Sequence, residues 1–227
     1  MNILIYLCVL IISIISIYFA KKLLGKLGLT LTFIGMSTLS FLLTFKYVTL
    51  STINLNSNCI PYVTMLISLY LLLETTNKKE TKEVINLNFI INIFSALMIY
   101  IMTDYTQSLT DTISINMKNV FVNNSQILIV YPLTTLLSSY LLIWVYEKIK
   151  KLYDNHFITT VTIYLLIGII EGIIYTFLVY IKILNTKTII LIILSTYMIR
   201  LITTVIYSLF LTILSKKKVL SWIVQHY

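Results

Sequence analysis

Long apolar runs separated by short polar stretches dominate the pattern along the chain. A helix needs roughly 20 apolar residues to cross a hydrocarbon core of about 30 Å. Seven runs qualify, and each predicts a membrane-spanning helix, at about 2–20, 27–45, 59–76, 84–103, 125–147, 157–181 and 188–215. Residues 1–227 are therefore expected to form a single all-α domain, a polytopic membrane helix bundle of about seven transmembrane helices.

The first run resembles a secretory signal peptide only in its position. It lacks a basic start and a small-residue cleavage site, and Lys21 and Lys22 follow it directly. We expect it to be a retained helix.

Lysines in the connecting segments alternate between the two sides of the predicted bundle. Twelve fall in the first, third and fifth connections and after the last run: Lys21, Lys22, Lys26, Lys78, Lys79, Lys82, Lys148, Lys150, Lys151, Lys216, Lys217 and Lys218. The other connections hold four: Lys46, Lys118, Lys182 and Lys187. Because basic loops stay in the cytoplasm, this pattern predicts an N-terminus outside and a C-terminus inside.

Two polar segments could touch the membrane surface. The connection 104–124 falls on the outer side, and both a short interfacial helix covering an external opening and a flexible loop fit its interleaved apolar residues. The tail 219–227 carries Trp222 and Tyr227 beside the last lysines, which is typical of a membrane-surface anchor.

The composition supports the same class. Hydrophobic residues make up 59% of the chain and charged residues 11%, whereas soluble domains carry about 25% charged residues. The net charge of +9 comes from lysine clusters between apolar runs, so we expect the lipid bilayer, and no nucleic acid, as a partner. The expected location is the cell membrane of a bacterium. Cys8 and Cys59 lie in or beside apolar runs, and indicate neither a disulfide framework nor a metal site.

Two ionisable residues lie deep in the last two runs. An intramembrane charge is costly unless it is paired or faces water. Glu171 is 15 residues from His156 and Arg200 is 15 residues from Ser215, so both should lie roughly 22 Å from the inner ends of antiparallel helices. We expect them to pair, directly or through water or a ligand.

Such a pair has two interpretations with similar weight. It could be a structural ion pair that fixes the register of two helices, or one wall of a substrate site. Gly168 and Gly172 flank Glu171 at a spacing that permits close helix approach, which slightly favours packing.

Other polar residues in the runs are less decisive. Glu74 and Glu147 lie near inner ends, where solvated ends within reach of lysines are expected. Asn88 and Asn92, near Asn86 on the fourth run, share one helical face. They should bond a neighbouring helix or bind a polar ligand, and the same alternatives apply to Gln126.

Motifs of catalysis and of ATP hydrolysis are absent from the sequence. It contains no P-loop, no zinc-protease helix motif, no Gly-x-Ser-x-Gly elbow and no CxxC, and its histidines are His156 and His226. We therefore expect a protein that is not an enzyme and binds no metal or cofactor.

Three segments carry a resemblance to a known family: AKKLLGKLGL from Ala20, LLLETTNKKETKEVI from Leu71, and the run 120–151. In order and spacing over about residues 17–215 they resemble the queuosine-precursor transporter (VUT) family, which is similar in shape to the substrate-binding membrane subunits of vitamin importers. The matching positions are Glu74 with Lys78 and Lys79, Trp144 with Tyr146 and Lys150, Glu171 for a usual Asp, and Arg200 for a usual Lys.

The chain departs from the family at several polar positions. The substitutions are Tyr70 for Asp, Gln126 for Arg, Ser139 and Leu142 for Gln and Asp, and Gly168 for Gln. Because deazaguanine edges need matched donors and acceptors, these losses suggest a diverged member with another substrate.

The resemblance implies a transporter of a small nitrogen-rich solute such as a 7-deazaguanine or a related nucleobase or vitamin. In that hypothesis Glu171, Arg200, Asn88, Asn92 and Glu74 supply polar contacts, and Tyr70, Trp144 and Tyr175 offer stacking faces. The alternative is a non-transporting membrane subunit, or the substrate-binding component of an importer that works with an ATPase partner.

Overall fold

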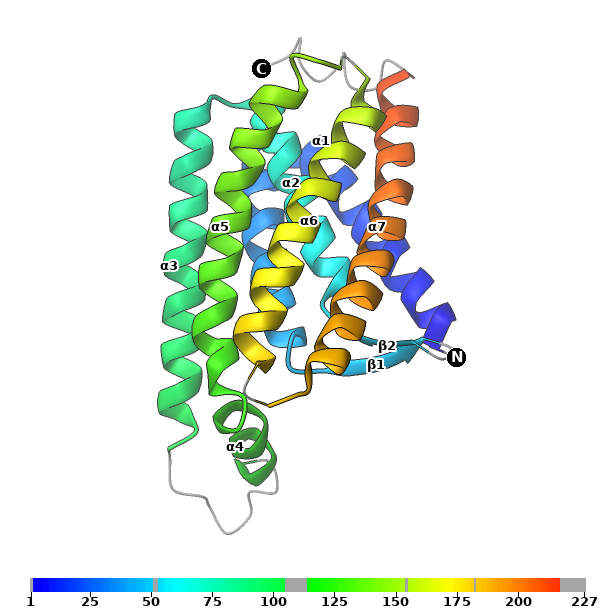
Figure 1. Ribbon diagram of the computed structural model, residues 1–227. Helices are drawn as coiled ribbons and strands as arrows, with labels where there is room; N and C mark the ends of the chain where they lie inside the picture. The colour runs from blue at the N-terminus through cyan, green and yellow to red at the C-terminus, as the bar shows by residue number, and fades with distance from the viewer. Residues whose placement is uncertain (1, 51–52, 105–113, 154, 182, 217–227) are drawn as a thin grey trace.

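The computed structural model describes residues 2–50, 53–104, 114–153, 155–181 and 183–216 and is a bundle of long helices (Figure 1). The helices are α1 (Asn2–Leu43), α2 (Cys59–Thr75), α3 (Lys78–Met102), α4 (Ser114–Val122), α5 (Ser125–Ile149), α6 (His156–Tyr180) and α7 (Thr186–Lys216). Within the described residues α1, α3, α5, α6 and α7 are long and apolar enough to cross a membrane. The predicted all-α membrane class is confirmed at this level.

Two glycines reverse the chain inside α1, where the sequence predicts two separate helices. Gly25 has φ 55° and ψ −127°, a backbone conformation that residues other than glycine rarely adopt. A Cβ on Gly28 would lie 2.0 Å from the carbonyl oxygen of Ala20, so only glycine allows the two arms to meet there. The motif AKKLLGKLGL is thus the bend that joins the first two predicted runs.

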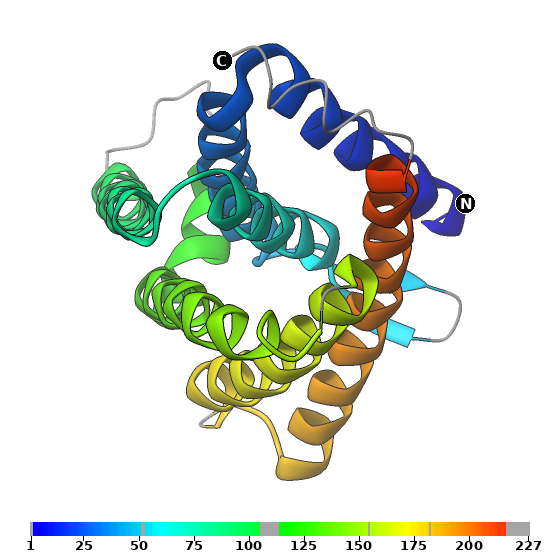
Figure 2. The same ribbon diagram turned by 90° about the horizontal axis from the view of Figure 1, so that it is seen from above.

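Helix α2 is the centre of the bundle. Every residue from Cys59 to Leu72 is buried, and a helix that is apolar on all sides belongs in an interior. Seen from above, α2 is surrounded by the second arm of α1, α5, α6 and α7 (Figure 2). At 17 residues it is the shortest of the predicted spans, about 25 Å long.

The outer helices turn apolar side chains outward. Ile12, Phe94, Ile129 and Leu191 are each more than 60% exposed. In a soluble protein so many exposed apolar side chains would favour aggregation, whereas in a bilayer they face lipid. The exposed faces therefore agree with the membrane class.

A β-hairpin joins α1 to α2, which the hydrophobic pattern did not predict. Strands β1 (Tyr47–Leu50) and β2 (Ile53–Asn56) pair antiparallel, with Tyr47 opposite Asn56. The strands are only 4 residues long, and such a short hairpin depends on tertiary packing. Here β2 packs against α7, and the Tyr47 hydroxyl bonds that of Tyr180.

The helix ends differ modestly from the predicted spans. Helix α3 begins at Lys78, ahead of the predicted start at 84, because the Asn77 side chain accepts a hydrogen bond from the Glu80 amide and caps the helix. In the connection 104–124, residues Ser114–Val122 form the helix α4, and Phe121 packs edge-on against Phe45. Residues 105–113 of that connection and the predicted tail anchor at 219–227 lie outside the described residues.

Candidate functional site

Glu171 and Arg200 meet in the interior of the bundle, as their depths predicted. The Arg200 Nη1 group donates a hydrogen bond to Glu171 Oε2 and forms an ion pair with it. The two residues are 3% and 6% exposed respectively. Removing two such groups from water is costly unless they are paired, and this direct contact offsets part of that cost.

The start of α2 completes the surroundings of the guanidinium. Asn58 Oδ1 lies 3.5 Å from Arg200 Nη2, and the Tyr62 ring centroid lies 4.0 Å from Arg200 Cζ. An arginine over an aromatic face is stabilised by the negative charge of that face. The site is therefore built from α6, α7 and the first turn of α2.

A hydrogen-bonded turn holds Asn58 in this position. The Asn56 side chain donates to the Thr44 carbonyl at 2.6 Å and accepts from the Asn58 amide at 3.0 Å. The Asn58 side chain in turn donates to Thr44 Oγ1 at 2.9 Å. The hairpin thus has a structural purpose, because it ends in the turn that brings α2 to Arg200.

Several polar atoms beside the ion pair have no partner among the described residues: Arg200 Nε and the hydroxyls of Tyr62 and Tyr175. The Tyr164 hydroxyl on α6 also lacks one. Buried donors are normally satisfied by protein or by water. A void of about 20 Å³ between α2, α6 and α7 is lined by Tyr62, Tyr164, Gly168 and Arg200, among others. A void of that size holds about one water molecule, so it is too small for a solute in this conformation.

The two glycines around Glu171 differ from each other. A Cβ on Gly168 would lie 3.4 Å from the Tyr197 ring, an ordinary contact, and a Cβ on Gly172 would meet nothing within 4 Å. Gly172 therefore does not serve the close helix approach that the spacing suggested. The register of α6 and α7 rests on the ion pair and on side-chain packing instead.

Asn88 and Asn92 bond a neighbouring helix, which was one of their two predicted alternatives. Both amides donate to Ser37 Oγ of α1, at 3.1 Å and 2.8 Å. The nearby Tyr131 hydroxyl donates to the Ser37 carbonyl at 3.0 Å. This polar contact joins α1, α3 and α5, and it leaves Asn92 Oδ1 without a partner among the described residues.

The remaining predicted residues lie in different surroundings. Trp144 is 55% exposed with Lys148 Nζ 3.7 Å from its ring centroid, so the structure does not bring it to the ion pair. Tyr175 lies one turn beyond Glu171 on the same buried face of α6. Among the predicted stacking residues, Tyr175 is the one placed beside the charges.

Glu74 is not a solvated helix end, and that expectation was wrong. Its side chain is 12% exposed and lies 3.1 Å from His156 Nδ1, while Tyr70 donates to the same carboxylate at 3.0 Å. Glu147 fits the expectation, because its half-exposed carboxylate pairs with Lys78 at 2.7 Å. The difference arises because α2 is buried on all sides and α5 is not.

Sequence reasoning missed Asn58, Tyr62 and His156. Asn58 immediately precedes an apolar run, a common position for a helix start, and that was the available signal. Tyr62 and His156 carry no signal of their own, since the partner of each comes from a distant part of the chain.

Comparison with known proteins returned no relative: no family model, no curated protein and no solved structure matches the chain.

Proposed function

We propose that this chain is a membrane transporter for a small nitrogen-rich solute, and that the Glu171–Arg200 pair is its binding site. The observation that carries the proposal is the set of buried donors beside the pair that lack partners among the described residues, namely Arg200 Nε and the hydroxyls of Tyr62 and Tyr175. A polar ligand would satisfy them, and intramembrane charges commonly mark transport pathways.

The solute would bind Glu171 and Arg200 in place of the contact that these two side chains make with each other. A cationic amino group suits the Glu171 carboxylate, an acceptor edge suits Arg200, and the Tyr62 and Tyr175 rings offer faces for a planar group. A 7-deazaguanine with an aminomethyl group, the solute class that the family resemblance implies, has all three features. Since the void is about 20 Å³, the helices must separate to admit it.

The proposed topology follows the lysine pattern. Seven crossings of the bacterial cell membrane would result, two from the arms of α1 and one each from α2, α3, α5, α6 and α7. The lysine-rich ends would lie in the cytoplasm. Helix α2 is short and buried, so it would cross inside the protein rather than against lipid.

Uptake of a labelled aminomethyl-deazaguanine into proteoliposomes tests the proposal. We expect Glu171→Gln to reduce uptake at least tenfold, because the variant cannot bind the cation with a full charge. Trp144→Leu is the matched control: its ring is exposed away from the pair, and uptake should stay within twofold of wild type. Undiminished uptake in a folded Glu171→Gln variant would remove the site from the proposal.

A second function is favoured by the direct contact between the two side chains. In it the chain is a non-transporting membrane subunit, or the substrate-binding component of an importer with an ATPase partner, and the pair is structural. The exchange Glu171→Arg with Arg200→Glu separates the two readings. A structural pair tolerates the inversion, whereas a ligand site loses its charge pattern.

A further inference from the structure

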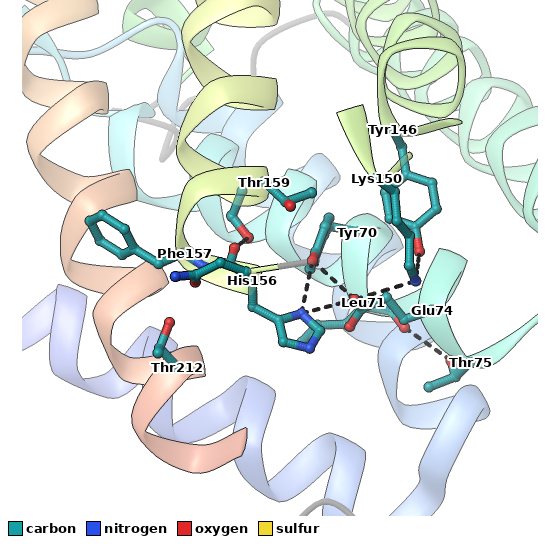
Figure 3. A network of polar contacts seen from close by, with 12 residues as sticks. Tyr70, Leu71, Glu74, Thr75, Tyr146, Lys150, His156, Phe157, Thr159 and Thr212 are labelled. Carbon is teal, nitrogen blue, oxygen red and sulfur yellow. Dashed lines mark hydrogen bonds and ion pairs between the residues drawn. The ribbon is translucent and has the colours of Figure 1, made fainter. Parts of the chain in front are cut away.

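A second polar cluster joins the inner end of α2 to the first residue of α6 (Figure 3). Tyr70, Glu74 and His156 lie in mutual contact: the Tyr70 hydroxyl is 3.0 Å from Glu74 Oε1 and 3.1 Å from His156 Nδ1, and Nδ1 is 3.1 Å from Oε1. Each atom of this triangle is within hydrogen-bond range of the other two. The arrangement can therefore exchange one hydrogen bond for another without moving the backbone.

Charged and titratable groups from other helices face the same cluster. Lys150, the residue that follows α5, has its Nζ 3.9 Å from Glu74 Oε1 and also donates to the Tyr146 hydroxyl. Lys21 of α1 acts electrostatically on both Glu74 and His156. His156, Tyr70 and Lys150 all face the Glu74 carboxylate and favour its charged form, so the group that exchanges a proton is the imidazole.

We propose that the Tyr70–Glu74–His156 cluster binds and releases a single proton, and that this proton is the coupling ion of the transporter. The second clause rests on the proposed function; the first does not. His156 precedes the apolar run at 157 and its side chain is 43% exposed, so its ring can exchange a proton with water. Its Nδ1 faces the buried carboxylate.

The exchange has two hydrogen-bonded states. In the protonated state the imidazolium Nδ1–H donates to Glu74 Oε1, and the Tyr70 hydroxyl donates to the same oxygen. On release, one proton passes from the ring to water, and the Tyr70 hydroxyl turns to donate to the bare Nδ1. The cluster loses one unit of positive charge, no electrons move, and Glu74 keeps Lys150 as its counter-charge.

The chemistry of the cluster suits a proton better than a metal ion. Within the part of the chain that the structure describes, no group of three or more His, Cys, Asp or Glu side chains could hold a metal. One imidazole and one carboxylate leave a metal under-coordinated, since protein zinc sites use at least three protein ligands.

Helix α2 physically connects the two polar sites. Asn58, just ahead of its first turn, contacts Arg200, and Glu74 near its last turn contacts His156. The interval of 16 residues spans about 24 Å of helix. When the proton leaves, the ion pair that holds α2 to α6 is lost at one end of a stiff element whose other end lies beside the solute site.

Proton binding is measured without any solute. The chain contains two histidines, His156 and His226, so an NMR titration of ring-labelled protein in nanodiscs gives two signals that the variants His156→Gln and His226→Gln assign. We expect Glu74→Gln to lower the pH at which His156 loses its proton by about one unit, because a carboxylate within ~4 Å stabilises the imidazolium. Coincident His156 curves in wild type and Glu74→Gln would overturn the proton site.

Coupling is measured by uptake into proteoliposomes with and without an imposed pH gradient. We expect the gradient to change wild-type and His226→Gln uptake at least threefold, and His156→Gln uptake to persist but ignore the gradient. Glu74→Gln, checked for folding by its unfolding midpoint, should show the same loss of response. A folded His156→Gln variant that still follows the gradient would overturn the coupling.

The two proposals fail in distinguishable ways. If His156 titrates with Glu74 as expected and no solute is taken up by any variant, the proton site stands and the transport function falls. If solute is taken up but the gradient has no effect on wild type, the transport function stands and the coupling falls.

Discussion

Replacing Glu171 by leucine would leave the Arg200 guanidinium in the bundle interior without its anion. Arg200 is 6% exposed, and its other neighbours include Asn58 Oδ1 at 3.5 Å, the Tyr62 ring at 4.0 Å and the Cys59 side chain. These contacts already exist in the wild type, so none of them offsets the loss. Breaking a buried ion pair on one side costs about 3–5 kcal/mol, and we expect that loss for Glu171→Leu and for Arg200→Met.

The double variant should behave differently from the sum of its parts. Replacing both members of a buried pair by apolar residues of similar volume is often neutral or stabilising. Glu171→Leu with Arg200→Met should therefore be more stable than either single variant, although additive losses would reach about 6–10 kcal/mol. The difference is the coupling energy of the pair.

Reversible unfolding in mixed micelles, followed by far-UV circular dichroism, gives the four free energies of the cycle. The half-exposed pair of Lys78 and Glu147 provides a matched control cycle, in which we expect little coupling because solvent screens the charges. The reasoning is refuted if Glu171→Leu costs less than about 1 kcal/mol, or if the two losses add within about 0.5 kcal/mol as independent sites do.

Two further predictions concern the backbone bend and the amide contact. Gly25→Ala should lower the unfolding free energy by about 1–3 kcal/mol through backbone strain alone, since a Cβ there meets no atom within 4 Å. Gly35 is equally open but has no positive φ, so Gly35→Ala should be neutral or stabilising by up to about 1 kcal/mol. Equal effects of the two substitutions would contradict the strain argument. Ser37→Ala should cost about 1–2 kcal/mol in the same unfolding assay because it leaves the amides of Asn88 and Asn92 without their acceptor. Asn86→Ala, which loses an exposed bond to Tyr140, should cost less, and the reverse order would refute the structural role of Ser37.

The depth of the central ion pair was predictable, because helix rise is constant. Glu171 and Arg200 lie about equally far from the His156 end of α6 and the Lys216 end of α7, and counting residues was enough to place them level. Which way each helix faces was not predictable from the count. The rotation of each helix about its own axis leaves Tyr175 of α6 buried and Trp144 of α5 exposed, and packing against neighbouring helices sets that rotation.

The second cluster shows the same limit more sharply. Glu74 looked like a solvated end because lysines follow it in the sequence, but its surroundings are set by α6 and α5, whose contacting residues are far away in the chain. The hairpin at Tyr47–Asn56 is a further case. Its strands are too short to be recognised from the sequence pattern, and they depend on packing against α7 for stability.

The sequence by itself determined the apolar segments, the membrane class and the matching level of Glu171 and Arg200, because these depend on local composition and on the fixed rise of a helix. Only the tertiary structure decided which helix is central, where α1 bends back on itself, and which polar groups meet. Those features depend on contacts between residues distant in the chain, and no local pattern encodes them. The two polar sites at the ends of α2 exist for that reason: the bundle encloses a helix on every side, and its polar ends must find their partners inside the protein.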